Sequence, residues 1–183
     1  MSNAIIYGFK RVGKTTLGSR IAEHLGCPFV DTDALWGRDC RQLYVELGET
    51  AFREREKKVV FSLEYVRKSI IATGGGTVLD PENAAFLKTL GCFIYLNFSK
   101  ETIKSRLFQA PLPAILDASD PIASFEKLYQ ERSSIYLKIA DMIVESEDEL
   151  WEVILGERFF VLRHGESLMD QPLGQSSMDV PQA

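Results

Sequence analysis

GFKRVGKTT, residues 8–16, is the stretch that decides how this chain folds. It fits the phosphate-loop pattern of a glycine, four residues, a second glycine, a lysine, and then serine or threonine. The glycines let the backbone turn tightly, so that consecutive N–H groups point at phosphate oxygens, and the lysine adds a positive charge. The simpler alternative is a glycine turn that enters a helix beside an unrelated lysine.

The segments on either side of the loop favour the phosphate site. A short apolar run at 4–7 precedes it, as a buried parallel strand would, and a helix follows that ends at Gly26. This order of strand, loop and helix predicts ATP binding, with Thr15 as a ligand of Mg²⁺. The residues expected at the nucleotide are Lys10, Arg11, Val12, Gly13, Lys14, Thr15 and Thr16.

The rest of the chain alternates strands with helices. Further strands are expected at 28–30, 69–73, 92–96 and 141–144, and helices at 42–69, 81–90, 124–140 and 147–155, with another that runs through Arg106. Asp80 is a plausible N-cap for the helix that begins at Pro81. We therefore expect an α/β fold in which a five-stranded parallel sheet lies between helices. The segment 109–121, with three prolines and few charges, is expected to be a loop or lid.

Acidic and glycine-rich segments follow two of the expected strands, at Asp31-Thr32-Asp33 and at Gly74-Gly75-Gly76. Aspartates at strand ends are often caps, and glycine runs are usually turns. In a parallel sheet, however, ligands bind at the carboxyl ends of the strands, where the phosphate loop also lies. One carboxylate could then hold Mg²⁺ or its water and another could accept a proton from an attacking hydroxyl, while the glycines let backbone N–H groups approach a substrate.

Composition limits the partners of the protein. The chain has 183 residues, a net charge of −5 and 45% hydrophobic residues, which is typical of one globular domain and gives no general attraction to nucleic acid or to an anionic membrane. No apolar run reaches membrane length, and the start lacks the features of a signal peptide. The three scattered cysteines indicate buried, reduced thiols. We expect a cytoplasmic monomer.

Four motifs in one order resemble the shikimate kinase family, which are small enzymes with a nucleoside-monophosphate-kinase-like fold. They are GFKRVGKT, DTD, GETAFRERE and TGGGTV, and ERSSIYLKIAD adds an Arg-x-x-x-Tyr helix that leads to Ala-Asp. The resemblance covers about residues 4–145. It implies a kinase domain at 1–156 and leaves residues 157–183 as a tail of unknown role.

The resemblance also implies a role for individual residues. Lys14 and the loop amides would hold the ATP phosphates, Asp31 would hold Mg²⁺ through water, and Asp33 would act as the base for the reacting hydroxyl of shikimate. The shikimate carboxylate would be bound by Arg53 and Arg132, since a guanidinium pairs with both oxygens. Glu56 would orient these arginines, and Arg106 would lie against the nucleotide. Gly74, Gly75 and Gly76 would border the substrate.

The sequence departs from the family pattern in two places. The family's lid usually carries Arg-Pro-Leu-Leu, whereas the segment LFQAPLPAILDASDP places Leu112 or Ala110 where the arginine is expected. The stretch between Asp33 and Arg53 is also a few residues shorter than usual. The sequence therefore predicts a shikimate kinase that moves the ATP γ-phosphoryl group to the 3-hydroxyl of shikimate. It leaves open a kinase for another hydroxy acid, such as gluconate, and a nucleotide-binding regulatory protein with weakened catalysis.

Overall fold

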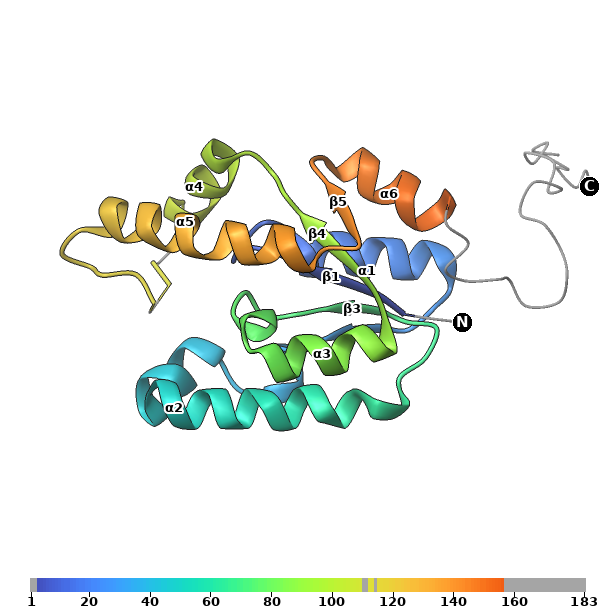
Figure 1. The fold of residues 1–183 in the computed structure, drawn as a ribbon, viewed down its shortest axis with the longest axis horizontal. Helices are drawn as coiled ribbons and strands as arrows, with labels where there is room; N and C mark the ends of the chain where they lie inside the picture. Colours follow the sequence, from blue (N-terminus) through green and yellow to red (C-terminus); the bar gives the residue numbers. More distant parts are fainter. Residues whose placement is uncertain (1–2, 110–111, 114, 157–183) are drawn as a thin grey trace, which may run out of the picture.

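A computed structural model of the chain describes residues 3–109, 112–113 and 115–156, and it contains one parallel sheet (Figure 1). Its strands run in the order β2-β3-β1-β4-β5. Their bounds are β1 Asn3–Tyr7, β2 Phe29–Asp31, β3 Ile70–Ala72, β4 Gly91–Leu96 and β5 Met142–Val144. In the register of the central strand, Ile5 lies between Ile71 and Phe93. The expected five-stranded parallel sheet between helices is confirmed.

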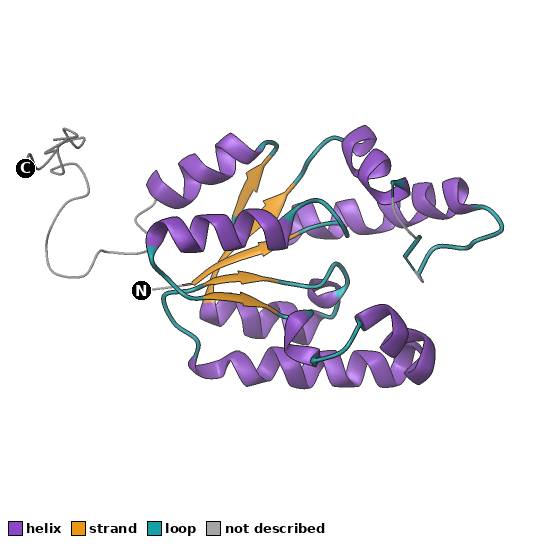
Figure 2. Ribbon diagram, turned by 180° about the vertical axis from the view of Figure 1, so that it is seen from behind, coloured by secondary structure: helices purple, strands orange, loops and turns teal. Residues whose placement is uncertain are grey.

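Helices cover both faces of the sheet (Figure 2). Helices α1 and α6 lie on one face, where Arg20 pairs with Glu147, and α3 and α5 lie on the other. The helix bounds are α1 Lys14–Leu25, α2 Cys40–Phe61, α3 Pro81–Leu90, α4 Lys100–Phe108, α5 Pro121–Ile139 and α6 Glu147–Gly156, with 3₁₀ turns η1 Ala34–Trp36, η2 Ser62–Tyr65 and η3 Thr77–Leu79. Strands β2 and β3 lie on one side of β1, and β4 and β5 lie on the other. The loop after β1 therefore lies where the strand order changes direction, which is where such sheets bind ligands.

A buried layer of aromatic side chains fixes α5 to the sheet. The rings of Tyr7, Tyr95 and Tyr136 contact one another, and the Tyr7 hydroxyl donates a hydrogen bond of 2.7 Å to the Tyr136 carbonyl oxygen. Burial of such a ring typically contributes about 1.5–3 kcal/mol. Helix α5 is therefore held in one position over the carboxyl ends of the strands, together with the side chains that it projects there.

Three helix boundaries and one burial expectation were predicted wrongly. The expected helix at 42–69 ends at Phe61 and breaks at Gly48, whose φ of 73° is not helical, because residues 62–69 form the turn that leads into β3. That helix begins earlier than expected because the Asp39 side chain caps it, and α5 begins at Pro121 rather than 124 because Asp120 caps it. Cys27, Cys40 and Cys92 are free thiols, but they are half-buried rather than buried.

Other expectations about local structure are confirmed. Gly26 ends α1 with a left-handed φ of 61°, and the Asp80 carboxylate caps α3 at Pro81. Ala110, one of the two positions considered for the lid arginine, and the tail at 157–183 lie outside the described residues. Within the part of the chain that is described, no helix combines the length and apolar character needed to cross a membrane.

Candidate active site

The phosphate loop joins β1 to α1 through an unusual backbone. Gly8 and Gly13 have φ values of 146° and 115°, and Arg11 between them has a φ of 63°, which few non-glycine residues adopt. Gly13 is the N-cap of α1 and supplies no side-chain acceptor, so the N–H groups of the first helical turn keep their capacity to bind a ligand. A helix N-terminus of this kind attracts phosphate oxygens.

Lys14 is the buried cation of the loop. Its side chain is folded back so that Nζ donates to the carbonyl oxygens of Gly8 and Phe9 at 3.0 and 2.7 Å. Burial lowers the pKa of Lys14 to about 8, although the nearby carboxylates of Asp33 and Asp31 oppose this change. The ammonium is thus held in place beside two negative groups, in a region where a phosphate charge would be poorly screened by water.

Two aspartates lie beside this lysine. Asp31 ends β2, and its carboxylate accepts hydrogen bonds from the Thr15 hydroxyl at 2.6 Å and from the Asp33 backbone N–H at 2.9 Å. Burial raises the pKa of Asp33, and the positive charge of Lys14 opposes that rise. The two carboxylates therefore differ in environment, because Asp31 is bonded to the loop while Asp33 faces the space beyond it.

The triple glycine lies in tight contact with the charged residues. A Cβ atom on Gly74 would lie 2.5 Å from Asp33 Oδ1, and one on Gly76 would lie 2.6 Å from Arg53 Nη1. The Gly75 carbonyl oxygen accepts a hydrogen bond from Arg132 Nη1 at 3.2 Å and another from the Tyr136 hydroxyl. Glycine at these positions is what lets the side chains come this close.

Arg53 is oriented by a buried carboxylate. Arg53 Nη1 donates to Glu56 Oε2 at 2.7 Å, and Glu56, which is only 4% exposed, also accepts a bond from the Thr77 hydroxyl at 2.8 Å. Arg132, which projects from α5, lines the same cavity as Arg53. The two arginines and Asp33 thus line one cavity, a suitable arrangement for a ligand that carries both a carboxylate and a hydroxyl group.

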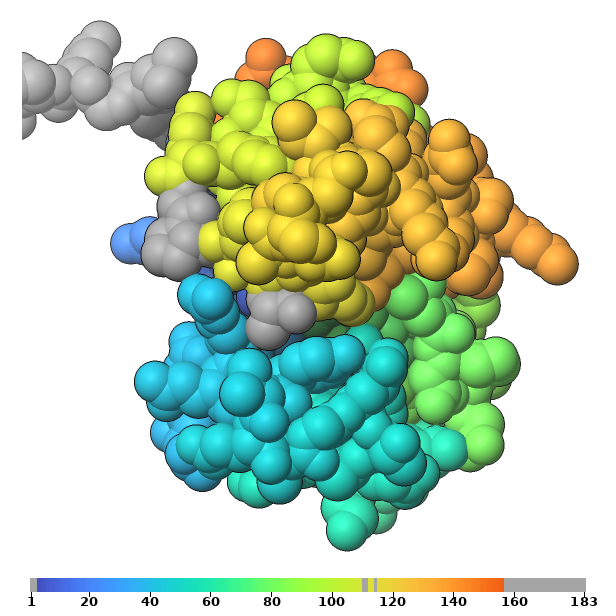
Figure 3. Space-filling model, turned by 90° about the vertical axis from the view of Figure 1, so that its left-hand side faces the viewer, coloured from blue at the N-terminus to red at the C-terminus, as the bar shows by residue number. Residues whose placement is uncertain are grey.

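Two adjoining cavities make up the site. The phosphate pocket is lined by the loop and by β2 and β3: Lys10, Arg11, Gly13, Lys14, Thr15, Thr16, Asp31, Asp33, Thr73 and Gly75. The acceptor pocket lies between α2 and the region that leads into α5, which face each other in Figure 3, and its charged lining is Lys10, Asp33, Arg41, Arg53, Glu56 and Arg132. Lys10, Asp33 and Gly75 line both cavities, and they therefore mark the boundary between them.

Comparison with known proteins identifies the family. A family model described as shikimate kinase matches residues 11–158. The chain belongs to the shikimate kinase family. Relatives named shikimate kinase include one from Thiobacillus denitrificans, 36% identical over 148 residues, which covers 79% of this chain and 81% of the relative. Another, from Syntrophus aciditrophicus, is 34% identical over 183 residues, with 87% of this chain and 94% of the relative covered.

A solved structure supports the same assignment. The shikimate kinase from Acinetobacter baumannii in complex with shikimate superimposes with a TM-score of 0.77 at 26% identity, over 86% of this chain and 95% of that one. The expected resemblance to the family and its kinase fold is thus confirmed, whereas the roles of single residues stay predictions.

Within this family site, three of the residues that were predicted at the nucleotide also contact other parts of the chain. Arg11 lines the phosphate pocket, but its Nη1 donates to the Leu107 carbonyl oxygen at 2.8 Å. The guanidinium of Arg106 lies over the Phe98 ring, and its Nη1 donates to the Val12 carbonyl oxygen at 2.6 Å. Arg106 therefore stabilises the backbone of the loop. Val12 has its side chain in the core. Neither Arg106 nor Val12 is among the described residues that line either cavity of the site.

Sequence reasoning missed several residues in the walls of the family site. The acceptor pocket is also lined by Phe9, Tyr44, Phe52 and Cys40. Burial raises the thiol pKa of Cys40 to about 12, so this thiol is not a nucleophile and only lines the pocket. The Thr73 hydroxyl is buried beside the phosphate pocket and has no hydrogen-bond partner among the described residues. Tyr136, whose hydroxyl donates to the Gly75 carbonyl oxygen, belongs to the Arg-x-x-x-Tyr motif of the sequence but was given no role there.

Proposed function

We propose that this protein transfers the γ-phosphoryl group of ATP to the 3-hydroxyl of shikimate. The observation that carries the proposal is the boundary between the two cavities. Asp33 lines both of them, with the loop and Lys14 on one side and the two arginines on the other. A hydroxyl bound in the acceptor pocket beside Asp33 would thus face a phosphate bound at the N-terminus of α1.

The chemistry follows from these positions. Asp33 accepts the proton of the 3-hydroxyl as its oxygen forms a bond to the γ-phosphorus, while the bond to the ADP oxygen breaks. Lys14 and the α1 amides hold the phosphate oxygens as charge shifts toward the leaving ADP. Arg53 and Arg132 bind the carboxylate of the acceptor, which fixes the orientation of the ring.

Magnesium belongs to the proposal as well. The Thr15 hydroxyl and the Asp31 carboxylate are hard oxygen donors that lie 2.6 Å apart at the edge of the phosphate pocket. Mg²⁺ prefers such ligands and usually keeps several waters beside one or two carboxylates and the substrate phosphates. When bound there, it would neutralise charge on the phosphates. The half-buried free thiols support a reducing compartment such as the cytoplasm, where we place the enzyme as a monomer.

The test is a steady-state assay of the purified protein with ATP, Mg²⁺ and either shikimate or gluconate. Arg53→Ala and Arg132→Ala should each raise the KM for shikimate by roughly tenfold or more, because a charge-assisted hydrogen bond is worth about 1.5–3 kcal/mol. The KM for ATP should change by less than about threefold. Arg20→Ala, which removes a surface ion pair to Glu147, is the matched control.

The outcomes separate the alternatives. Equal effects on the KM values of both substrates would mean that the arginines do not bind the acceptor. Faster turnover of gluconate than of shikimate would change the substrate. A parent protein that binds ATP but phosphorylates neither acid would favour a nucleotide-binding regulatory protein.

A further inference from the structure

The lid segment of this chain carries no basic residue that could face the transferred phosphoryl group. Residues 109–121 include no lysine or arginine, so neither expected register supplies the arginine that the family pattern has there. A charge of this kind stabilises the transition state of phosphoryl transfer by several kcal/mol in related reactions. Another cation must take its place if the protein is an efficient kinase.

Most of the nearby cations already have other partners or the wrong position. The guanidinium of Arg11 is bonded to the last turn of α4, and that of Arg106 is bonded to the backbone of the loop. Arg41 lines the acceptor pocket and is not among the described residues of the phosphate pocket. Lys14 is fixed by two carbonyl oxygens deep in the loop.

Lys10 differs from all of these. It lines both cavities, at the boundary that it shares with Asp33. Its side chain is exposed, and its ammonium makes no hydrogen bond or ion pair with any residue that the structure describes. The backbone of Lys10 is held against Gly75, since a Cβ atom on that glycine would lie 3.3 Å from the Lys10 nitrogen.

We propose that Lys10 is a catalytic residue whose ammonium contacts the transferred phosphoryl group and takes over the role of the missing lid arginine. This inference rests on the proposed function and names one more residue of the same site. As the phosphorus–oxygen bond to ADP breaks and the bond to the acceptor oxygen forms, the proton passes to Asp33. Lys10 takes no part in this proton transfer and acts only through its positive charge. The electrostatic effect of Lys10 on the pKa of Asp33 is consistent with this location.

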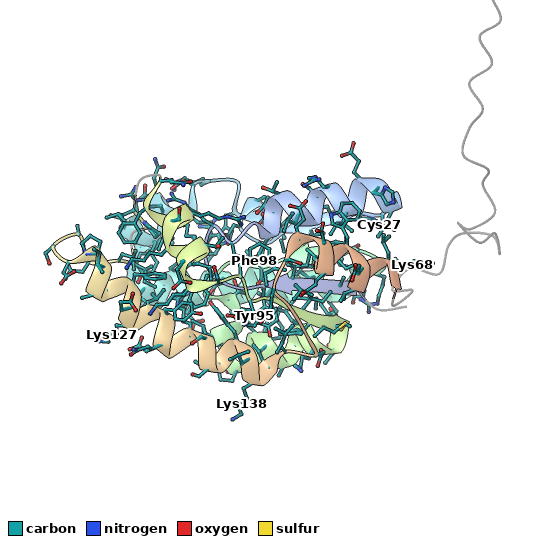
Figure 4. All side chains as sticks on the ribbon, turned by 90° about the horizontal axis from the view of Figure 1, so that it is seen from above. Cys27, Lys68, Tyr95, Phe98, Lys127 and Lys138 are labelled. Carbon is teal, nitrogen blue, oxygen red and sulfur yellow. The ribbon has the colours of Figure 1, made fainter. Side chains whose placement is uncertain are left out.

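The test compares Lys10→Met, which keeps the unbranched shape and most of the length of the side chain but not its charge, with Lys10→Arg, which keeps the charge. Lys10→Met should lower kcat by about 100-fold, as expected for the loss of a group that acts on the transition state. The KM values for ATP and shikimate should change by less than about threefold, and Lys10→Arg should retain most of the activity. Lys138→Met is the matched control, because Lys138 projects from α5 away from the site (Figure 4). A kcat for Lys10→Met within threefold of the parent would overturn the proposal.

A binding experiment separates this proposal from the proposed function. ADP with Mg²⁺ and aluminium fluoride mimics a phosphoryl group in transfer, whereas ADP alone does not. Lys10→Met should bind ADP as the parent does, but bind the aluminium fluoride complex at least tenfold more weakly. If the parent fails to phosphorylate shikimate, the proposed function is wrong, and this ratio still decides the role of Lys10. Equal affinities of parent and variant for the aluminium fluoride complex would contradict that role.

Discussion

At the scale of single residues, the site depends on two opposite charges that are both partly removed from water. Burial lowers the pKa of Lys14 and raises that of Asp33, so each charged form is disfavoured by its surroundings and supported by the other. Groups with perturbed pKa values in a cleft are typical of catalytic sites. The types of these residues could be predicted from the motifs, but their burial depends on neighbours that are distant in sequence.

The raised pKa of Asp33 predicts the acid limb of the pH profile. If Asp33 is the base, only its ionised form is active, so kcat/KM for shikimate should fall as the pH is lowered through the raised pKa. That fall should occur above the ordinary aspartate value of 3.8. Asp33→Asn should lower kcat by roughly 100-fold or more, because general base catalysis contributes about 10²–10⁴.

The measurement is a pH–rate profile of the parent, with Asp148→Asn as the control, since Asp148 is exposed in the first turn of α6. An acid limb with its midpoint at or below pH 3.8 would argue against Asp33 as the base, and so would an Asp33→Asn variant of undiminished kcat.

At the scale of elements, Gly74 and Gly76 after β3 leave room for charged side chains that come from other elements. Gly76 meets the guanidinium of Arg53, which Glu56 holds on its other side. The sequence indicated that the triple glycine lies near the substrate, but the pattern gave no sign of which side chain each glycine admits. That information needs the position of α2 relative to β3.

Gly76→Ala should therefore act on the acceptor and not on the nucleotide. The new methyl group would displace Arg53, because 2.6 Å is far below any normal contact distance. The KM for shikimate should rise by roughly tenfold, while the KM for ATP and the melting temperature should change little. Gly156→Ala is the control, as a Cβ atom there has no neighbour within 4 Å. An unchanged KM for shikimate would show that Arg53 does not need its present position.

Helix boundaries show where local sequence signals suffice. Asp80-Pro81 predicted the start of α3 correctly, because the capping carboxylate and the fixed proline φ act within a few residues. The same Asp-Pro signal at Asp120-Pro121 starts α5, three residues before the predicted start at 124. The end of α2 could not be predicted from amphipathic pattern alone, since it depends on the distance that the chain must cross to reach β3.

At the scale of the whole molecule, the order of motifs predicted the sheet and the meeting of its loops, because parallel strands bring their carboxyl ends to one edge. The directions of long side chains were not predictable in the same way. Arg11 was expected to reach the phosphates because it lies inside the loop, yet its guanidinium donates to the Leu107 carbonyl oxygen in the last turn of α4, where carbonyl groups lack helical partners. The segment after Asp33 packs Trp36 against Phe52, a contact that only the folded chain defines.

At this scale the burial of Lys14 gives a prediction for the stability of the whole fold. Lys14 has a pKa of about 8 in the folded protein and an ordinary value of 10.5 when unfolded. Between these values the unfolded chain binds more protons than the folded one, so the free energy of unfolding should rise with pH across this window. The rise that is due to Lys14 is roughly 3 kcal/mol. In Lys14→Met this contribution should be absent, while every other titratable group is common to both proteins. Urea unfolding of parent and variant between pH 7 and 10.5 measures the difference. If the free energy of unfolding changes with pH in the same way in both proteins, burial of the charged Lys14 side chain does not destabilise the fold.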